Sequence, residues 1–206
     1  MTQVLKINSS LYGDNGQSSQ LASQFIEALR ERDGGVQVVE RDVTTEPVPH
    51  LDATRFQAFL TKPEERTAAQ RDIVAFSDEL IGELKSADVV VLGLPMYNFS
   101  VPSQLKAYFD HVARAGVTFK YTEKGPVGLL TGKKAYVFAT RGGVHAGTPG
   151  DTETAYVRTF LGFLGIRDVE FVFAEGLALG DTHRTASVAQ AQRALQNLAA
   201  PAALAA

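Results

Sequence analysis

Residues 88–108, DVVVLGLPMYNFSVPSQLKAY, decide the fold that this sequence predicts. The run 89–92 is short, continuous and β-branched, which is typical of a strand buried on both faces of a parallel sheet. A helix should follow, with Ser100 as its N-cap, Pro102 in its first turn and apolar residues at helical spacing as far as Val112. A strand, a loop and a helix in this order indicate one unit of an open α/β sheet.

The loop between this strand and this helix is PMYNF, residues 95–99. In an open α/β sheet, the loops that leave the carboxyl ends of the strands line the ligand crevice. Met96, Tyr97 and Phe99 would offer apolar contact to a flat aromatic ligand, while the Asn98 amide and the backbone N–H groups address its polar edges. The alternative is that the three apolar side chains only plug the end of the sheet as core.

Hydrophobic patterning extends this unit to a whole sheet. Four further apolar runs predict strands at 4–7, 36–39, 135–139 and 169–173. Amphipathic helical segments separate them, and a C-terminal helix is expected at 185–198. Such an alternation favours an α/β, flavodoxin-like three-layer sandwich with a five-stranded parallel sheet in the order 2-1-3-4-5. We expect one domain over residues 1–206.

Two insertions interrupt this pattern, at about 45–66 and 116–132. The first is bounded by prolines and should form a small helical flap, either a lid or a surface segment, because of four apolar residues: Leu51, Phe56, Phe59 and Leu60. The second has Phe119 and Tyr121 in the alternation of a short hairpin. Its aromatic rings would edge a pocket or meet another subunit.

A polar loop, NSSLYGDNGQSSQ at 8–20, follows the first strand. Its hydroxyls and glycine N–H groups can bind an anion at the start of the next helix, where the helix dipole also favours negative charge. The loop is neither GxGxxG nor GxxxxGK[ST], so it carries no dinucleotide fingerprint and no P-loop. The alternative is a solvated turn with Ser18 or Ser19 as N-cap. Asp14 would have to point away from a bound phosphate.

A third loop at the same edge is TRGGVHAGTPGDT, residues 140–152. Its adjacent glycines, Gly142 and Gly143, allow a ligand to approach the backbone closely. The first loop would then take a phosphate, and the second and third would hold an aromatic ring between them. This arrangement suits a mononucleotide flavin better than a permanently bound NAD.

Composition and charge exclude several other functions. The 206 residues are 45% hydrophobic and 21% charged, with a formal net charge of −3, which argues against nucleic acid and anionic membranes as partners. The chain has no Cys and no apolar stretch of about 20 residues, so we expect a soluble, cytoplasmic protein without thiolate chemistry. His50, His111 and His183 lack the spacing of metal ligands, and no metal site is predicted.

Four segments together carry a resemblance over nearly the whole chain: PMYNF, TRGG with His145 beyond it, AYFDHVARAGVTFKYTEKGPVGL at 107–129 and TFLGFLGIRDVEFVFAEG at 159–176. The chain resembles the FMN-dependent NADH-azoreductases of the flavodoxin-like NAD(P)H:quinone reductase superfamily. The resemblance implies bound FMN, NADH or NADPH as electron donor, and reduction of quinones and azo compounds by a ping-pong mechanism. It also implies a homodimer, with Tyr121 and Phe163 at the edge of the substrate pocket.

The resemblance assigns the flavin contacts to all three loops, with the phosphate on the first, the ring on the second and the pyrimidine side of the ring on the third. These residues are Ser10, Gly16, Gln17, Ser18, Met96, Tyr97, Asn98, Phe99, Thr140, Arg141, Gly142 and Gly143. No covalent catalytic residue is expected. His145 would either protonate the acceptor or be simply solvated, and Tyr121 would either donate a proton or pack at the dimer seam.

Three other functions compete with this one. A flavodoxin-like electron carrier would favour a strongly acidic face, and −3 on 206 residues supports it only weakly. An NAD(P)H-dependent flavin reductase would share the same fold. A flavin-free signalling module would need clustered acidic residues for Mg²⁺ after the first strand, where this chain has Asn8, Ser9 and Ser10. Arg55 and Lys62 are the flap's candidates for contacting the nicotinamide nucleotide, and they leave NADH against NADPH open.

Overall fold

The computed structural model describes residues 1–200. Its centre is a parallel sheet whose strands are β1 (Thr2–Asn8), β2 (Val36–Asp42), β3 (Val89–Pro95), β6 (Lys134–Thr140) and β7 (Asp168–Ala174). Val90 and Leu92 of β3 belong to one hydrophobic cluster and Val91 to the other, so this strand is buried on both faces. The predicted α/β class and five-stranded parallel sheet are confirmed.

The order of the strands across the sheet is β2-β1-β3-β6-β7. Numbered along the chain, this is 2-1-3-6-7 and not the predicted 2-1-3-4-5. The difference arises because the segment after β3 and its helix contributes two strands of its own, β4 (Phe119–Thr122) and β5 (Gly125–Gly128), which pair as an antiparallel hairpin outside the sheet. β6 and β7 are the fourth and fifth strands of the sheet itself.

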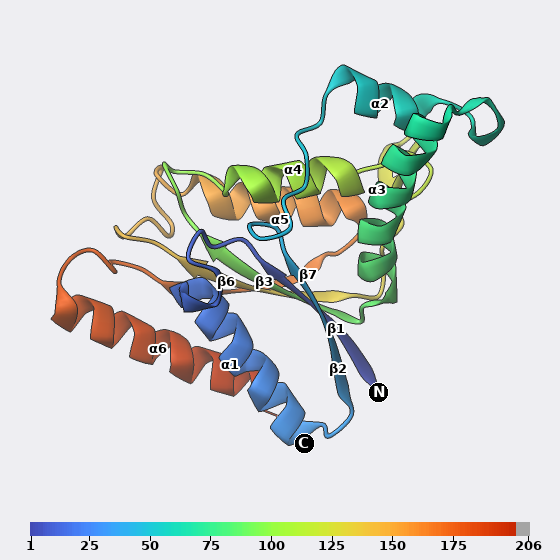
Figure 1. Cartoon of the computed structure of the whole chain (residues 1–206). Helices are drawn as coiled ribbons and strands as arrows, with labels where there is room; N and C mark the ends of the chain where they lie inside the picture. The colour runs from blue at the N-terminus through green and yellow to red at the C-terminus, as the bar shows by residue number, and fades with distance from the viewer. Residues whose placement is uncertain (201–206) are drawn as a thin grey trace.

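Helices cover both faces of the sheet (Figure 1). One face carries α1 (Gln17–Arg32) and α6 (Asp181–Ala199). The other carries α3 (Ala68–Ser86), α4 (Ser103–Val112) and α5 (Thr152–Leu164). Each layer buries its own hydrophobic cluster against the sheet, and none of the helices in residues 1–200 has the length and apolar character needed to cross a bilayer.

Two helices begin at residues other than those the sequence suggests: α4 begins later, and α1 begins earlier. α4 begins at Ser103 with Pro102 in the N-cap position, rather than with Ser100 as N-cap. The reason is that the backbone N–H and C=O of Ser100 are both bonded to Tyr97, which places Ser100 in a tight turn. α1 begins at Gln17 with Gly16 as its N-cap, so neither Ser18 nor Ser19 caps it.

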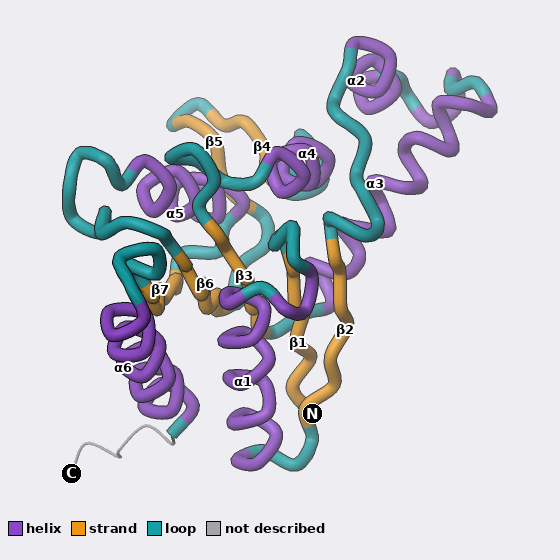
Figure 2. Tube along the Cα trace, turned by 60° about the vertical axis from the view of Figure 1, so that its left-hand side comes forward, coloured by secondary structure: helices purple, strands orange, loops and turns teal. Residues whose placement is uncertain are grey.

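The two insertions form the small elements that the sequence predicts. The first holds α2 (Ala53–Leu60) and the 3₁₀ turn η2 (Pro63–Glu65), and Figure 1 shows α2 standing apart from the sheet beside the start of α3. Phe59 of α2 packs its ring 5.8 Å from that of His111 on α4. The second is the β4–β5 hairpin, which Figure 2 shows beside α4 and α5 on the side away from the sheet.

Candidate functional site

The loops after β1 and β3 meet at the point where the order of the strands reverses. β1 and β3 are neighbours, and Asn8 is paired with Gly93 at their carboxyl ends. The Ser9 hydroxyl donates to the Gly93 carbonyl at 2.8 Å, and the Leu11 N–H donates to the Tyr97 hydroxyl at 3.2 Å. Parallel α/β sheets bind their ligands at this kind of switch point.

Polar groups without partners collect where α1 begins. The hydroxyls of Ser18 and Ser19 are buried and have no hydrogen-bond partner within residues 1–200. No side chain caps the helix, and the N–H groups of Gln17 and Ser18 make no hydrogen bond to another described residue. Because a buried polar group without a partner costs about 1–3 kcal/mol, these donors fit an external anion such as a phosphate.

Close packing shapes the same corner. A Cβ atom on Gly16 would overlap the Ser10 hydroxyl, so a side chain at position 16 would displace Ser10. Ser10 is buried, and its hydroxyl accepts the Tyr12 N–H at 3.2 Å. Asp14 lies on the 3₁₀ turn η1 (Gly13–Asn15), where its carboxylate is 3.8 Å from the Lys6 ammonium. The same ammonium lies 3.0 Å from Glu40, and the Asp14 side chain is largely exposed.

The PMYNF loop closes as a two-residue turn between Tyr97 and Ser100, which bond to each other in both directions at 3.0 and 3.1 Å. Asn98 and Phe99 at its tip have φ angles of 51° and 62°. Two successive positive φ angles are those of a type I′ turn, and they are strained for a non-glycine residue such as Phe99. Phe99 is 60% exposed and Met96 is half-buried, so this loop does not plug the sheet as core.

The loop after β6 lies against the PMYNF turn. The Met96 N–H donates to the Thr140 carbonyl at 2.9 Å, and the Thr152 hydroxyl donates to the Phe99 carbonyl. The His145 ring packs edge-on to the Phe99 ring, with 5.5 Å between centroids. His145 is thus half-buried against the turn rather than simply solvated.

Gly142 and Gly143 expose donors in this loop. Their carbonyls accept the N–H groups of Ala178 at 3.0 Å and Gly176 at 2.8 Å, from the segment after β7. Their own N–H groups have no acceptor among the described residues. Two adjacent free donors at the carboxyl edge are suited to the polar edge of a ring or to a developing negative charge.

Arg141 differs from the other predicted contact residues, because its side chain is fully buried. The guanidinium lies 2.8 Å from Asp151, 3.1 Å from Glu175 and 3.5 Å from Glu153. The structure directs this side chain into the protein, and the Arg141 N–H and C=O are bonded to Ala174 and Leu177 at 3.0 and 3.1 Å, so its side chain and both of its backbone polar groups already have partners within the protein.

The carboxyl groups around Arg141 divide into two kinds. Burial alone would raise the pKa of Asp151, but hydrogen bonds from Arg141 and from the Thr154 N–H hold it below its usual range. Burial raises the pKa of Glu153 to about 8, against the opposing charge of Arg141. Asp151 is therefore an anionic partner of Arg141, and the raised pKa of Glu153 favours its protonated form.

Tyr121 and Phe163 lie in a separate aromatic cluster. Both pack on Phe119, with ring centroids 5.4 Å away for Tyr121 and 4.3 Å away for Phe163. Tyr121 is 74% exposed on the hairpin. The structure does not bring these two residues into contact with the three loops of the same chain.

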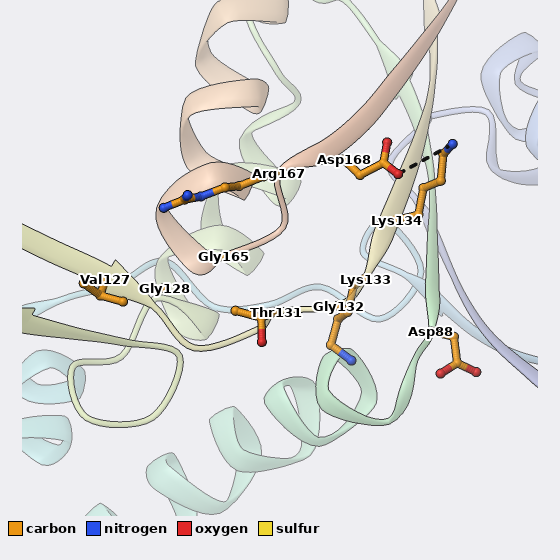
Figure 3. Close-up of a pocket in the computed structure, with 10 residues that line it drawn as sticks. All are labelled: Asp88, Val127, Gly128, Thr131, Gly132, Lys133, Lys134, Gly165, Arg167 and Asp168. Atoms are coloured by element: carbon orange, nitrogen blue, oxygen red, sulfur yellow. Dashed lines mark ion pairs between the residues drawn. The ribbon is translucent and has the colours of Figure 1, made fainter.

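A cavity of about 570 Å³ opens at the opposite, amino edge of the sheet. Lys133 donates to the Lys85 carbonyl at 2.8 Å, where α3 ends, and Lys134 lies 3.6 Å from Asp168. Figure 3 shows that the charged ends of Arg167, Lys133 and Lys134 point away from one another. The cations of this cavity therefore do not converge on one point, and two of them already have partners within the protein.

Sequence reasoning left two polar residues out of the predicted site. Ser19 shares the buried, unpartnered position of Ser18, and its signal is the paired serine at a helix start. Glu175 accepts the N–H groups of His145 and Ala146 at 2.9 and 2.8 Å. Its signal is an acidic residue placed directly after a buried strand, at the edge where the loops meet.

These features define an α/β protein whose candidate site lies at the carboxyl edge of a parallel sheet. Residues 2–199 match a family described as having a flavodoxin-like fold. The FMN-dependent NADH:quinone oxidoreductase of Cellvibrio japonicus is 56% identical over 180 residues, which cover 87% of this chain and 90% of that protein. The one from Alcanivorax borkumensis is 54% identical over 192 residues, covering 93% and 97%. The chain belongs to this family of flavodoxin-like oxidoreductases.

Solved structures agree with the sequence relatives. The azoreductase from Bacillus anthracis str. Sterne has a TM-score of 0.88 and 29% identity, covering 97% of this chain and 99% of that one. The FMN-dependent NADH-azoreductase from Bacillus anthracis str. Ames Ancestor, crystallised in complex with FMN, has a TM-score of 0.87 and 29% identity, covering 97% and 98%.

Proposed function

We propose that this protein binds FMN at the carboxyl edge of its sheet and uses NADH to reduce quinones and aromatic azo compounds. The observation that carries the proposal is the pair of buried, unpartnered hydroxyls of Ser18 and Ser19 beside free N–H groups at the start of α1. A phosphate would satisfy them. The names of the relatives supply the cofactor and the two classes of acceptor.

The residues proposed to hold FMN come from the three loops. Ser10, Gly16, Gln17 and Ser18 would surround the phosphate. Met96, Tyr97, Asn98 and Phe99 would lie along the ring, and Thr140, Gly142 and Gly143 would meet its pyrimidine side. Gly142 and Gly143 would donate their free N–H groups to the negative charge that the reduced ring carries there, without reorganising. Arg141 supports these donors from within the protein.

Bound FMN would supply the hydride acceptor and donor, so the protein needs no nucleophile of its own. The PMYNF turn and the loop after β6 would cover the ring from the protein side and leave one open approach. We infer that NADH and the acceptor use this approach in turn, which is a ping-pong order. His145 stands beside Phe99 at the same place, where its imidazole would give a proton to the accepting substrate.

We further propose a homodimer with Tyr121 and Phe163 facing the site of the other subunit. The support is that these two residues form an aromatic cluster with Phe119 away from the loops of their own chain, and that Tyr121 is exposed. Light scattering of the FMN-loaded protein would give the mass of two chains. A single-chain mass together with full activity would refute the dimer.

The test of function is a titration followed by turnover. The purified protein should bind FMN one to one and then oxidise NADH with a benzoquinone or an aromatic azo dye, without any partner protein. Double-reciprocal plots of initial rate against NADH concentration, measured at several fixed acceptor concentrations, should be parallel lines, as a ping-pong order requires. A protein that takes up no FMN, or that binds it and oxidises NADH only with a partner protein, would overturn the proposal.

Two further comparisons belong to the same assay. FMN that stays bound through gel filtration separates this function from a flavin reductase, which releases its reduced flavin. Measuring turnover with NADPH and with NADH in parallel shows which nucleotide is the preferred electron donor. Quinone turnover equal to or faster than azo turnover would support a cellular role in quinone detoxification, and far slower quinone turnover would count against that role.

A further inference from the structure

A single buried guanidinium closes the base of the loop after β6. Arg141 precedes the loop and Asp151 follows it, and Arg141 Nη2 is 2.8 Å from Asp151 Oδ1. The same Asp151 oxygen accepts the Thr154 N–H at 3.1 Å, which caps α5. The two ends of the loop, residues 142–150, are therefore fixed to each other and to the start of a helix.

Glu175 fixes the middle of this loop. Its Oε1 atom accepts the His145 N–H at 2.9 Å and the Ala146 N–H at 2.8 Å, and the same atom lies 3.1 Å from Arg141 Nη1. Glu175 directly follows the end of β7, and its own N–H donates to the Ser187 hydroxyl of α6 at 2.9 Å, so it lies outside the loop that it holds. One carboxylate oxygen thus connects two loop amides to the end of β7 and to the buried cation.

The other backbone groups of the loop include three kinds: carbonyls that accept hydrogen bonds, amides that donate to Glu175, and amides without an acceptor in residues 1–200. The carbonyls of Arg141, Gly142 and Gly143 accept N–H groups from Leu177, Ala178 and Gly176 at 3.1, 3.0 and 2.8 Å. The amides of His145 and Ala146 are held by Glu175. The N–H groups of Gly142 and Gly143 stay free within the described residues, as do those of Val144 and Gly147, so the donors that the proposed flavin site would use are among the amides left unbonded.

We propose that Glu175, held by Arg141, is a positioning residue that orders the loop and so presents the Gly142 and Gly143 N–H groups to the flavin. The inference rests on the proposed FMN site. In this role Glu175 accepts hydrogen bonds from two amides and touches no ligand itself. Donors fixed in advance stabilise a developing negative charge without a reorganisation cost.

A second buried arginine provides a matched control. Arg41 lies on β2 and is surrounded by Glu46, Glu79 and Glu83, and its Nη1 and Nη2 atoms lie 2.6 Å from Glu46 and 2.7 Å from Glu79. The Glu83 side chain is 14% exposed, against 13% for Glu175. Glu83 binds its arginine but accepts no loop amide among the described residues, so Glu83→Ala removes an equivalent ion pair without touching the loop.

The experiment compares three variants, Glu175→Ala, Glu175→Gln and Glu83→Ala, by FMN affinity and by the midpoint potential of the bound flavin. Glu175→Ala should weaken FMN binding at least about tenfold. If it weakens reduced FMN tenfold more than oxidised FMN, the potential should fall by about 30 mV. Glu175→Gln keeps a carbonyl oxygen for both amides and should stay within about threefold of wild type. Glu83→Ala should lower Tm and leave both flavin quantities unchanged.

Three results would overturn the inference. Wild-type affinity and potential in Glu175→Ala would do so. So would a Glu175→Gln variant as impaired as Glu175→Ala, because charge rather than acceptance would then matter. Weakened binding in Glu83→Ala would show that any lost ion pair has the same effect. If the wild-type protein fails to bind FMN, the proposed function fails instead, and the two failures are distinguishable.

A measurement on the wild-type protein remains informative if Glu175→Ala does not fold. In the FMN-free protein, amide hydrogen exchange should be slow at His145 and Ala146, whose N–H groups are bonded to Glu175. It should be fast at Gly142 and Gly143. Equal exchange at all four positions would contradict the ordering of the loop by Glu175.

Discussion

The two edges of the sheet differ in how their polar groups are paired, and the volume of the cavity at one edge does not show this difference. The amino edge holds the cavity of about 570 Å³, yet Lys133 is bonded to backbone carbonyls and Lys134 is paired with Asp168. The carboxyl edge has buried hydroxyls and free amide donors that nothing in residues 1–200 satisfies. Buried polar groups that a fold leaves unpaired are costly, so the Ser18 and Ser19 hydroxyls make the carboxyl edge a better candidate for the ligand site than the cavity volume makes the amino edge.

The largest expected effect comes from filling the corner where α1 begins. Gly16→Val would push a side chain into Ser10 and displace the proposed phosphate, and FMN affinity should fall at least about 100-fold. Gly34→Ala is the control, because a Cβ there meets nothing within 4 Å at the amino edge. Fluorescence titration of FMN measures both variants. If Gly16→Val bound FMN with wild-type affinity, the start of α1 would not be the phosphate position, and this reason for preferring the carboxyl edge would be lost.

A smaller effect is expected from removing the unpartnered hydroxyls. The double variant Ser18→Ala and Ser19→Ala should bind FMN about tenfold more weakly, since each hydroxyl would lose one hydrogen bond to the phosphate. The FMN-free variant should be as stable as wild type or more stable, because these buried hydroxyls have no partner. Denaturant melts with and without FMN would show both changes. A loss of stability in the FMN-free variant would mean that the hydroxyls are satisfied within the protein.

The buried carboxyl group at the carboxyl edge should make stability depend on pH. Burial raises the pKa of Glu153 from its ordinary value near 4.5 to about 8. Between these values the folded protein keeps a proton that the unfolded chain has lost, so stability should fall as pH rises from about 5 to 8. Glu153→Gln stays neutral, and its Tm should fall by several degrees less over this range. Parallel Tm curves for both proteins would show that Glu153 ionises normally.

The smallest effect is expected at the amino edge. Lys134→Ala and Arg167→Ala each remove a cation that lines the large cavity, and FMN affinity should change less than about twofold. Lys134→Ala should cost less than about 1 kcal/mol of stability, because its ion pair with Asp168 is exposed. FMN titration and thermal melts measure these. A tenfold loss of FMN affinity would indicate that the cofactor binds at the amino edge, contrary to our proposal.

The sequence predicted the sheet well because its strands are buried runs of apolar residues. The run from Val89 to Leu92 is short and rich in β-branched valine, which favours a buried strand over a helix. The start of α4 could not be predicted, since Ser100 is a good N-cap by type and only its pairing with Tyr97 removes it from that role. The strand numbering differed because the predicted order counted only the strands of the main sheet and left out the two strands of the hairpin, β4 and β5, although the alternation of Phe119 and Tyr121 predicts that hairpin.

The site was less predictable where it depends on contacts distant in sequence. Sequence alone places Arg141 in the loop but cannot tell whether its side chain faces a ligand or the interior. That depends on Glu175, 34 residues away, and on Asp151, 10 residues away. The Ser18 contact follows from the sequence because the start of a helix favours an anion, and it stays a prediction.

A crystal structure of the FMN-loaded protein tests the central claim most directly. The account predicts electron density for the phosphate at the N-terminus of α1, within hydrogen-bonding distance of Ser18, and for the ring between the Tyr97–Ser100 turn and Gly142 and Gly143. Density for FMN in the cavity lined by Lys133, Lys134 and Arg167 would contradict it.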